Sequence, residues 1–142
     1  MTRRLFVIDD NVDYQFIFFK LLKEMNRPYS VKFFENAKSC HQHMLSLRLV
    51  NATDRPSLIL TDLHMPGMNG LQLLKLIRHD DIQRDNFFQD VALVVMSSYL
   101  SEGQIVQCYQ AGADAVILKP YDFVQLKQTV ESICNFWLER EV

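Results

Sequence analysis

The sequence predicts an α/β protein with a doubly wound, five-stranded parallel sheet and five helices. Three observations indicate this class. Five short apolar runs alternate with segments in which apolar residues recur every three or four positions. The connections are mostly too short for anything but packing of neighbouring elements. Polar residues of chemical interest follow four of the five runs. The 142 residues are expected to form one domain, with no second domain after it.

The predicted strands are apolar runs bounded by turn residues, which is typical of strands covered by helices on both faces. The most strongly β-patterned run is Val91-Ala92-Leu93-Val94-Val95-Met96. We expect strands over residues 5–8, 29–35, 57–62, 91–96 and 115–118.

The predicted helices combine a helical apolar period with recognisable ends. Asn36, Ser101 and Asp122 are expected to be N-caps, and Gly112 is expected to follow the end of a helix. An apolar stripe gives the first helix its core-facing side, formed by Tyr14, Ile17, Phe18, Leu21, Leu22 and Met25. We expect helices over residues 12–25, 37–49, 71–78, 102–111 and 123–137.

Composition and charge exclude several classes of protein. Hydrophobic residues make up 49% of the chain and charged residues 23%, as in an ordinary globular protein. The net charge of -2 gives no reason to expect direct binding of nucleic acid. A predicted core strand begins close to Met1, which leaves no room for a signal peptide, and no apolar stretch approaches the length of a membrane span. We therefore expect a cytoplasmic protein that does not enter a membrane.

The cysteines and histidines give no sign of a soft-metal site. Cys40, Cys108 and Cys134 are widely separated and lack the close pairs of a zinc site or a disulfide framework, so we expect buried, reduced thiols. His41 and His43 point to different faces of a predicted helix and are expected at the surface.

Chemistry-bearing side chains gather at one edge of the predicted sheet. The strand ends carry Asp9 and Asp10, Asp62, Ser97 and Lys119. The carboxyl ends of parallel strands share an edge, and ligands of such sheets bind beyond it. Three neighbouring carboxylates repel one another unless a cation neutralises them, and an all-oxygen set suits Mg²⁺.

A lysine ammonium and a serine hydroxyl beside these acids form a site for a phosphoryl oxygen. The chemistry indicated is phosphoryl transfer to or from a carboxylate, with Asp62 as nucleophile. Each residue alone also has an ordinary structural role: residues 9–11 can cap a helix, and an acid before a Pro/Gly-rich loop is often a turn residue. Their joint placement after four predicted strands favours the functional interpretation.

The motifs around these residues resemble the receiver domain of bacterial two-component response regulators, over essentially the whole chain. The resemblance implies a flavodoxin-like, CheY-like receiver fold. It rests on Val7-Ile8-Asp9-Asp10-Asn11, Thr61-Asp62-Leu63-His64-Met65-Pro66-Gly67-Met68-Asn69-Gly70, Val94-Val95-Met96-Ser97-Ser98, Ala111-Gly112-Ala113-Asp114-Ala115 and Lys119-Pro120-Tyr121.

The resemblance also implies roles for the site residues. Asp62 becomes the phosphoacceptor and a metal ligand. Asp10 becomes the direct Mg²⁺ ligand, Asp9 acts through water, and the backbone carbonyl of His64 completes the set.

For the phosphoryl group itself, the resemblance implies that Lys119 pairs with the acyl phosphate and that the Ser97 hydroxyl moves to bond a phosphoryl oxygen. It also implies a cis peptide bond between Lys119 and Pro120, a form that only about 5–6% of such bonds adopt in general.

Two departures from the receiver pattern matter. Val116 stands where receivers usually have a Tyr or Phe that moves on phosphorylation, and a Val has no ring to swing inward. Tyr99, two residues after Ser97, is a candidate substitute reporter; the alternative is an ordinary surface tyrosine. The connection 79–90 is unusually long, has room for an extra helical turn, and should lie away from the acids.

The expected function is that of a single-domain response regulator, a phosphoacceptor and not a turnover enzyme. It would take its phosphoryl group from a sensor histidine kinase or a histidine phosphotransfer protein and signal by protein contact. The chain also resembles stand-alone receivers paired with phytochrome-like kinases. Phe16 and Phe19 are candidate docking residues, and Phe136 and Leu138 are candidates for a homodimer contact.

Two rival functions stay open. Val116 suggests a degenerate receiver that acts as a constitutive interaction scaffold. A haloacid-dehalogenase-like phosphatase also uses an aspartate nucleophile at a strand end, but that family has a second acid two residues later, where this chain has His64.

Overall fold

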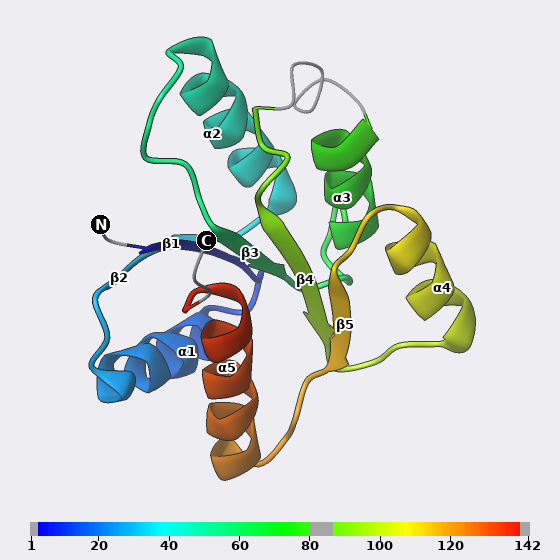
Figure 1. The fold of residues 1–142 in the computed structure, drawn as a ribbon. Coiled ribbons are helices and arrows are strands. Elements are labelled where there is room, and N and C mark those ends of the chain that lie inside the picture. Colours follow the sequence, from blue (N-terminus) through cyan, green and yellow to red (C-terminus); the bar gives the residue numbers. More distant parts are fainter. Residues whose placement is uncertain (1–2, 80–86, 140–142) are drawn as a thin grey trace.

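The computed structural model describes residues 3–79 and 87–139. In this part of the chain, strands and helices alternate strictly, and the predicted fold class is confirmed (Figure 1). The strands are β1 (Arg3–Ile8), β2 (Tyr29–Phe34), β3 (Leu58–Thr61), β4 (Ala92–Ser97) and β5 (Ala115–Leu118). The helices are α1 (Val12–Met25), α2 (Ala37–Leu49), α3 (Gly70–His79), α4 (Glu102–Gln110) and α5 (Phe123–Trp137).

All strands of the sheet are parallel, in the order β2-β1-β3-β4-β5. The chain runs outward from β1 to β2 and then returns past β1 to β3, so the winding direction reverses between β1 and β3. Parallel sheets of this kind bind their ligands at this reversal, beyond the carboxyl ends of the strands. Asp9 and Asp62 directly follow these two strands.

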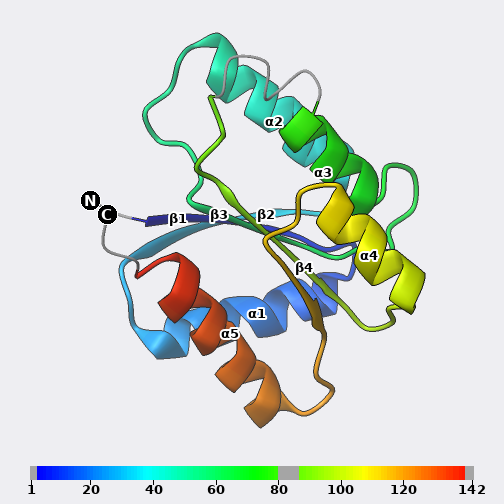
Figure 2. The same ribbon diagram turned by 45° about the vertical axis from the view of Figure 1, so that its right-hand side comes forward.

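Helices cover both faces of the sheet. Helices α1 and α5 lie on one face, and α2, α3 and α4 lie on the other (Figures 1 and 2). Successive strand side chains point to opposite faces, so Leu5 and Val7 belong to the core under α1 and α5, whereas Phe6 and Ile8 belong to the core under α2, α3 and α4. This double burial explains why β3 and β4, whose residues are all buried, are almost entirely apolar.

The predicted helix caps are confirmed. The side chains of Asn36, Ser101 and Asp122 each accept a hydrogen bond from a backbone N–H of the helix that follows. Ser101 and Gln104 form a reciprocal capping box. Gly112 follows α4 with a φ of +108°, a left-handed conformation that favours glycine.

Packing corrects two of the sequence predictions. Leu138, proposed for a dimer contact, is only 1% exposed and belongs to the core under α1 and α5, because the chain continues to curl after α5. Ile17, predicted on the core stripe, is 36% exposed. Phe136, Phe16 and Phe19 do remain exposed.

The cysteines and the two α2 histidines are partly as predicted. All three cysteines are buried free thiols. His43 is half-buried instead of at the open surface, with its ring 5.6 Å from the Phe6 ring and 5.7 Å from the Phe34 ring. His41 is likewise half-buried.

The connection between α3 and β4 is described only in part. Residues 80–86, where the extra helical turn was predicted, lie outside the described residues. Residues 87–90 form a turn in which Phe88 is fully buried. Arg55 donates a hydrogen bond of 2.6 Å to the Phe87 carbonyl and lies over the Phe87 ring, which fixes this turn to the loop before β3.

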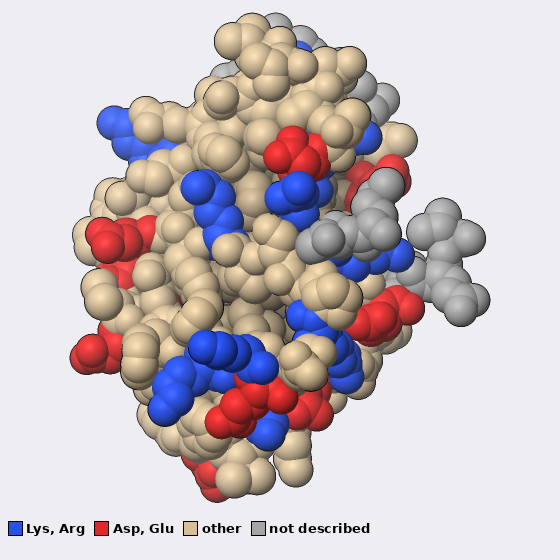
Figure 3. Space-filling model, turned by 90° about the vertical axis from the view of Figure 1, so that its left-hand side faces the viewer, with Lys and Arg blue, Asp and Glu red and all other residues tan. Residues whose placement is uncertain are grey.

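Charges of both signs are interspersed on the face that Figure 3 shows. Among the described helices, none combines the length and the apolar character that a bilayer crossing requires.

Candidate functional site

The strand ends meet because the backbone ladder of the sheet continues into the residues that follow the strands. The Asp62 N–H donates to the Ile8 carbonyl at 3.0 Å, and the Lys119 N–H donates to the Ser97 carbonyl at 2.7 Å. The Asp9 N–H donates to the end of β2 at 3.1 Å. The sheet itself therefore fixes the backbone of these site residues.

The three predicted acids converge. Asp9, Asp10 and Asp62 each place one carboxylate oxygen within 4.8 Å of the others. Hard divalent cations bind oxygen ligands at about 2.0–2.6 Å, directly or through a bound water, so these three acids could together hold one such ion. Asp9 is buried, Asp62 is half-buried and Asp10 is exposed. The chemistry and spacing of this set fit Mg²⁺ or a similar ion, with access from solvent on the Asp10 side.

Asp9 is the acid most strongly affected by its surroundings. Its exposed fraction is 3%, and burial raises the pKa of its carboxyl group above the ordinary value of 3.8. The Asn11 N–H donates to Oδ1 at 2.9 Å and the Lys119 ammonium donates to Oδ2 at 2.9 Å; both bonds oppose the rise in pKa. The nearby charge of Asp62 adds to it.

Lys119 joins two of the acids. Its ammonium lies 2.9 Å from Asp9 Oδ2 and 3.5 Å from Asp62 Oδ2, and only 11% of the side chain is exposed. The same ammonium lies 3.8 Å from the centroid of the Tyr14 ring. The sequence did not reveal this contact, because Tyr14 fits the apolar stripe of α1 and nothing in that stripe indicates a cation above it.

Asn11, one of the residues 9–11 that the sequence analysis gave as able to cap a helix, and Gln15, which the sequence analysis missed, hold the β1 end in place. Asn11 caps α1, with its side chain accepting from the Tyr14 N–H at 3.1 Å. The Gln15 side-chain amide donates to the Asp9 carbonyl at 2.6 Å and to the Phe34 carbonyl at 3.2 Å. The sequence signal for these contacts was the presence of polar residues just after the acid pair. A short motif of this kind does not show which backbone groups the polar side chains will bond.

The loop after β3 folds back over Asp62. The His64 N–H donates to Asp62 Oδ1 at 3.2 Å, and the Gly70 N–H donates to the Leu63 carbonyl at 3.1 Å. A Cβ atom at Gly70 would collide with the Asp62 carbonyl oxygen. Glycine is therefore required where α3 begins, because this helix end packs directly on the backbone of Asp62.

Ser97 and His64 share one backbone acceptor. Ser97 is 1% exposed, and its hydroxyl donates to the Tyr99 carbonyl at 3.3 Å. The His64 ring Nε2 forms a 2.8 Å hydrogen bond with the same carbonyl. The Tyr99 ring, by contrast, is 68% exposed. The loops after β3 and β4 are thus joined through the Tyr99 main chain.

Val116 is half-buried, and its backbone is held by α4. Its N–H donates to the Tyr109 hydroxyl at 3.2 Å. Since β5 is an edge strand, this bond satisfies a donor that has no neighbouring strand. Helix α4 is therefore connected to β5 at the position where the resemblance implies a mobile ring.

The peptide bond between Lys119 and Pro120 is trans, so the cis form implied by the resemblance is wrong for this structure. The trans bond still leaves the Lys119 ammonium in contact with Asp9.

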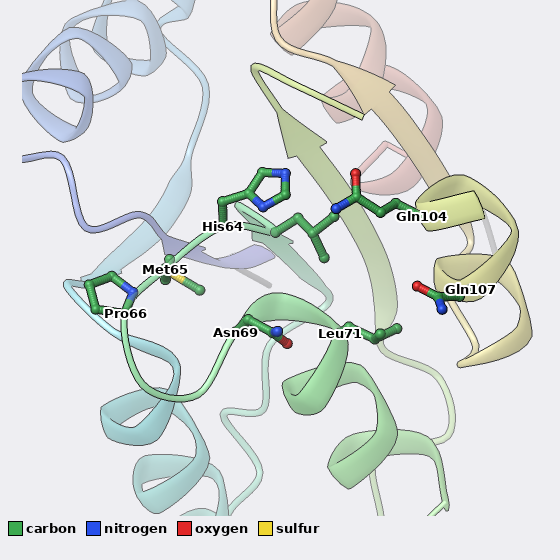
Figure 4. A pocket seen from close by; sticks show the side chains of 8 residues that line it. His64, Met65, Pro66, Asn69, Leu71, Gln104 and Gln107 are labelled. Atoms are coloured by element: carbon green, nitrogen blue, oxygen red, sulfur yellow. The ribbon is translucent and has the colours of Figure 1, made fainter. Parts of the chain in front are cut away.

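A cavity of about 430 Å³ lies next to the Asp62 loop. Figure 4 shows it between the loop after β3, the start of α3 and one side of α4, with His64 and Gln104 at one end. Its walls mix apolar and amide side chains and are formed by Leu63, His64, Met65, Pro66, Asn69, Leu71, Gln104 and Gln107.

Comparisons with known proteins agree with the fold. The family model of the response regulator receiver domain matches residues 5–131. Chemotaxis protein CheY-3 of Vibrio cholerae is 25% identical over 130 residues, which cover 92% of this chain and 90% of that protein.

Two solved structures share the fold over nearly their whole length. The phosphorylated cyanobacterial phytochrome response regulator RcpA is 26% identical, with a TM-score of 0.84 and coverage of 100% of this chain and 98% of that one. The Mn²⁺-bound form of response regulator Rcp1 is 20% identical, with a TM-score of 0.80 and coverage of 99% and 97%.

Proposed function

Since the chain belongs to the response regulator receiver domain family, we propose that it accepts a phosphoryl group on Asp62. The donor is a sensor histidine kinase or a histidine phosphotransfer protein, and the signal passes on by phosphorylation-dependent contact with a further protein. The observation that carries this proposal is the meeting of three carboxylates and the Lys119 ammonium at one edge of the sheet.

The proposed reaction is an in-line displacement. A carboxylate oxygen of Asp62 attacks the phosphorus of a phosphohistidine, so that a P–O bond forms as the P–N bond breaks. The electron pair of the broken bond stays on the imidazole nitrogen, and solvent supplies the proton that the neutral ring needs. The product is an aspartyl phosphate and a free histidine.

Mg²⁺ is the cofactor we propose, held by Asp9, Asp10, Asp62 and the backbone carbonyl of His64. When bound, such an ion neutralises negative charge on the acids and on the phosphoryl oxygens. The fit of the three acids to a hard cation supports this assignment.

Lys119 and Ser97 act on the phosphoryl group after transfer. The ammonium already lies within 3.5 Å of Asp62, so a small movement brings it to a phosphoryl oxygen. The Ser97 hydroxyl makes a long bond of 3.3 Å to the Tyr99 carbonyl. Long hydrogen bonds are weak, so this one is readily exchanged for a bond to the charged phosphoryl oxygen, which is stronger.

A constitutive scaffold is the second candidate, because Val116 cannot supply the moving ring and its backbone is tied to α4 through Tyr109. The two candidates differ in the chemistry of Asp62, since a scaffold has no need of it. In either case the chain is a binding or phosphoacceptor module rather than a turnover enzyme, as is general in this family.

Labelling by a small phosphodonor such as acetyl phosphate, with Mg²⁺ present, tests the proposal. We expect one phosphoryl group per molecule in the wild-type protein. In Asp62→Asn, we expect the labelling rate to fall about tenfold or more, so that at least nine-tenths of the label is lost. The matched control is Asp13→Asn, an exposed acid in the first turn of α1, which should label normally. Equal labelling of Asp62→Asn and wild type would refute the phosphoacceptor role.

A further inference from the structure

The Lys119 ammonium is held from three sides, and one of these sides is an aromatic face. We propose that Tyr14 is a positioning residue for phosphoryl transfer: its ring holds the Lys119 ammonium in the orientation that reaches Asp62. This inference rests on the proposed function, because Lys119 acts on the phosphoryl group there.

The geometry accounts for all three N–H donors of the ammonium. One points to Asp9 Oδ2 at 2.9 Å and one to Asp62 Oδ2 at 3.5 Å. The Tyr14 ring centroid lies 3.8 Å from Nζ, well inside the about 6 Å over which a cation and an aromatic ring attract. Because only 11% of the Lys119 side chain is exposed, little water competes, and desolvation strengthens this attraction.

The ring is itself fixed, as a positioning group must be. The Tyr14 N–H donates to the Asn11 cap at 3.1 Å, its hydroxyl donates to Met96 Sδ at 3.8 Å, and its ring centroid lies 6.1 Å from that of Phe18. Met96 is the residue before Ser97 on β4. The Tyr14 ring is therefore held between the start of α1 and the end of β4.

A neutral ring suits this position better than a third acid. A carboxylate would bind the ammonium strongly and compete with an incoming phosphoryl group for its charge. Burial and the charges of Asp9 and Asp62 raise the pKa of Tyr14, so the phenol stays neutral at physiological pH. The ring thus orients Lys119 while leaving its positive charge available.

Helix α1 offers a matched pair for comparison. The Lys20 ammonium lies 5.8 Å from the Phe16 ring centroid, at the exposed surface and outside the acid cluster. A change at Phe16 removes an aromatic ring and a cation contact on the same helix without touching the site.

The first experiment measures the initial rate of labelling by acetyl phosphate. We expect Tyr14→Leu to lower this rate about tenfold, in line with the loss of a desolvated cation–π contact. Tyr14→Phe keeps the ring face and should retain most of the rate, and Phe16→Leu should match wild type. Equal rates for Tyr14→Leu and wild type would overturn the inference.

A double-mutant cycle separates positioning from a structural role. In a Lys119→Met background, Tyr14→Leu should cause no further loss of rate, because the ring then has no ammonium to position. If Tyr14→Leu lowers the rate by the same factor in both backgrounds, the residue acts through the core and the inference is wrong.

A measurement on the unphosphorylated protein keeps this test separate from that of the proposed function. Protons that lie over a ring face resonate upfield, so the Lys119 ε-methylene should be shifted upfield in the wild type and in Tyr14→Phe but not in Tyr14→Leu. An unshifted methylene in wild type would overturn the inference whether or not the chain labels. Absence of wild-type labelling with a shifted methylene would instead refute the proposed function.

Discussion

Asp9 shows that a site residue can oppose folding. Asp9 is 3% exposed, and the loss of hydration is the largest single influence on its pKa, which it raises; two hydrogen bonds oppose this rise. Burial of a charge costs several kcal/mol before its partners offset part of that cost, on the order of the values seen for buried ion pairs. In the proposed function, the chain keeps this acid because the proposed metal site needs it.

The raised pKa of Asp9 predicts how stability depends on pH. Between the ordinary value of 3.8 and the raised value, the folded chain binds more protons than the unfolded chain. The stabilisation from proton uptake is therefore complete below the unfolded pKa and is lost as pH rises through the folded pKa. In EDTA at pH 7, Asp9→Asn should increase the free energy of unfolding by about 1 kcal/mol, because the amide removes the buried charge. Its one acceptor oxygen keeps the hydrogen bond from the Asn11 N–H, and Lys119 keeps Asp62 as a partner.

Urea unfolding of both proteins at several pH values checks this prediction. The advantage of Asp9→Asn should shrink as pH approaches 4, a value close to the ordinary pKa of 3.8. Asp13→Asn, an exposed acid on α1, serves as the control and should show no such trend. A less stable Asp9→Asn at pH 7 would mean that the ion pair with Lys119 outweighs the cost of burial.

At the scale of elements, the Tyr99 carbonyl connects two loops. It accepts from His64 Nε2 on the β3–α3 loop at 2.8 Å and from Ser97 at 3.3 Å. If Ser97 turns to a phosphoryl oxygen, His64 becomes the remaining partner of this carbonyl. The β4–α4 loop would then move together with the β3–α3 loop. This coupling offers the signal a route that does not require an aromatic side chain in place of Val116.

This route predicts a defect in signalling that is separate from phosphorylation. In His64→Ala, the change in the amide NMR signal of Gly103, in the first turn of α4, should fall about fivefold when compared at equal labelling, since one hydrogen bond contributes about 1 kcal/mol. Tyr99→Ala keeps the carbonyl and should preserve the response.

His79→Ala is the matched control for this experiment. His79 Nε2 also bonds a backbone carbonyl, that of Ala111, at 3.1 Å, but at the opposite end of α3. Its loss should leave the Gly103 response intact. A full response in His64→Ala, or a lost response in Tyr99→Ala, would assign the coupling to the tyrosine ring instead.

For the whole molecule, the sequence was sufficient for the order of elements, the caps and the acids at the strand ends. These features depend on the local spacing of apolar residues and on the rule that the carboxyl ends of parallel strands lie at one edge of the sheet. The contact of Tyr14 with Lys119 and the shared Tyr99 carbonyl depend on how distant segments meet, which no local pattern encodes. Leu138 was misassigned for a related reason. It lies just after the last residue of α5, where the backbone conformation and not the apolar period of the helix decides that the side chain is buried.

Folding also creates the proposed metal site, since the unfolded chain has nothing to hold Asp62 beside Asp9 and Asp10. A ligand that binds only the folded state stabilises it by an amount that grows with the logarithm of its concentration. Metal binding by these three acids would therefore be coupled to the stability of the entire domain, and metal removal should lower its thermal midpoint.

The thermal midpoint should rise when Mg²⁺ is added, by roughly 5–11 °C at one hundred times the dissociation constant, a gain of about 2.7 kcal/mol. Asp10→Asn should lose most of this increment yet unfold near the wild-type midpoint in EDTA, because Asp10 is exposed and its substitution alone costs about 0.5 kcal/mol or less. Sodium chloride at matched ionic strength controls for screening, which acts on all surface charges alike. An equal rise with sodium chloride, or an undiminished Mg²⁺ effect in Asp10→Asn, would show that the ion binds elsewhere than among these three acids.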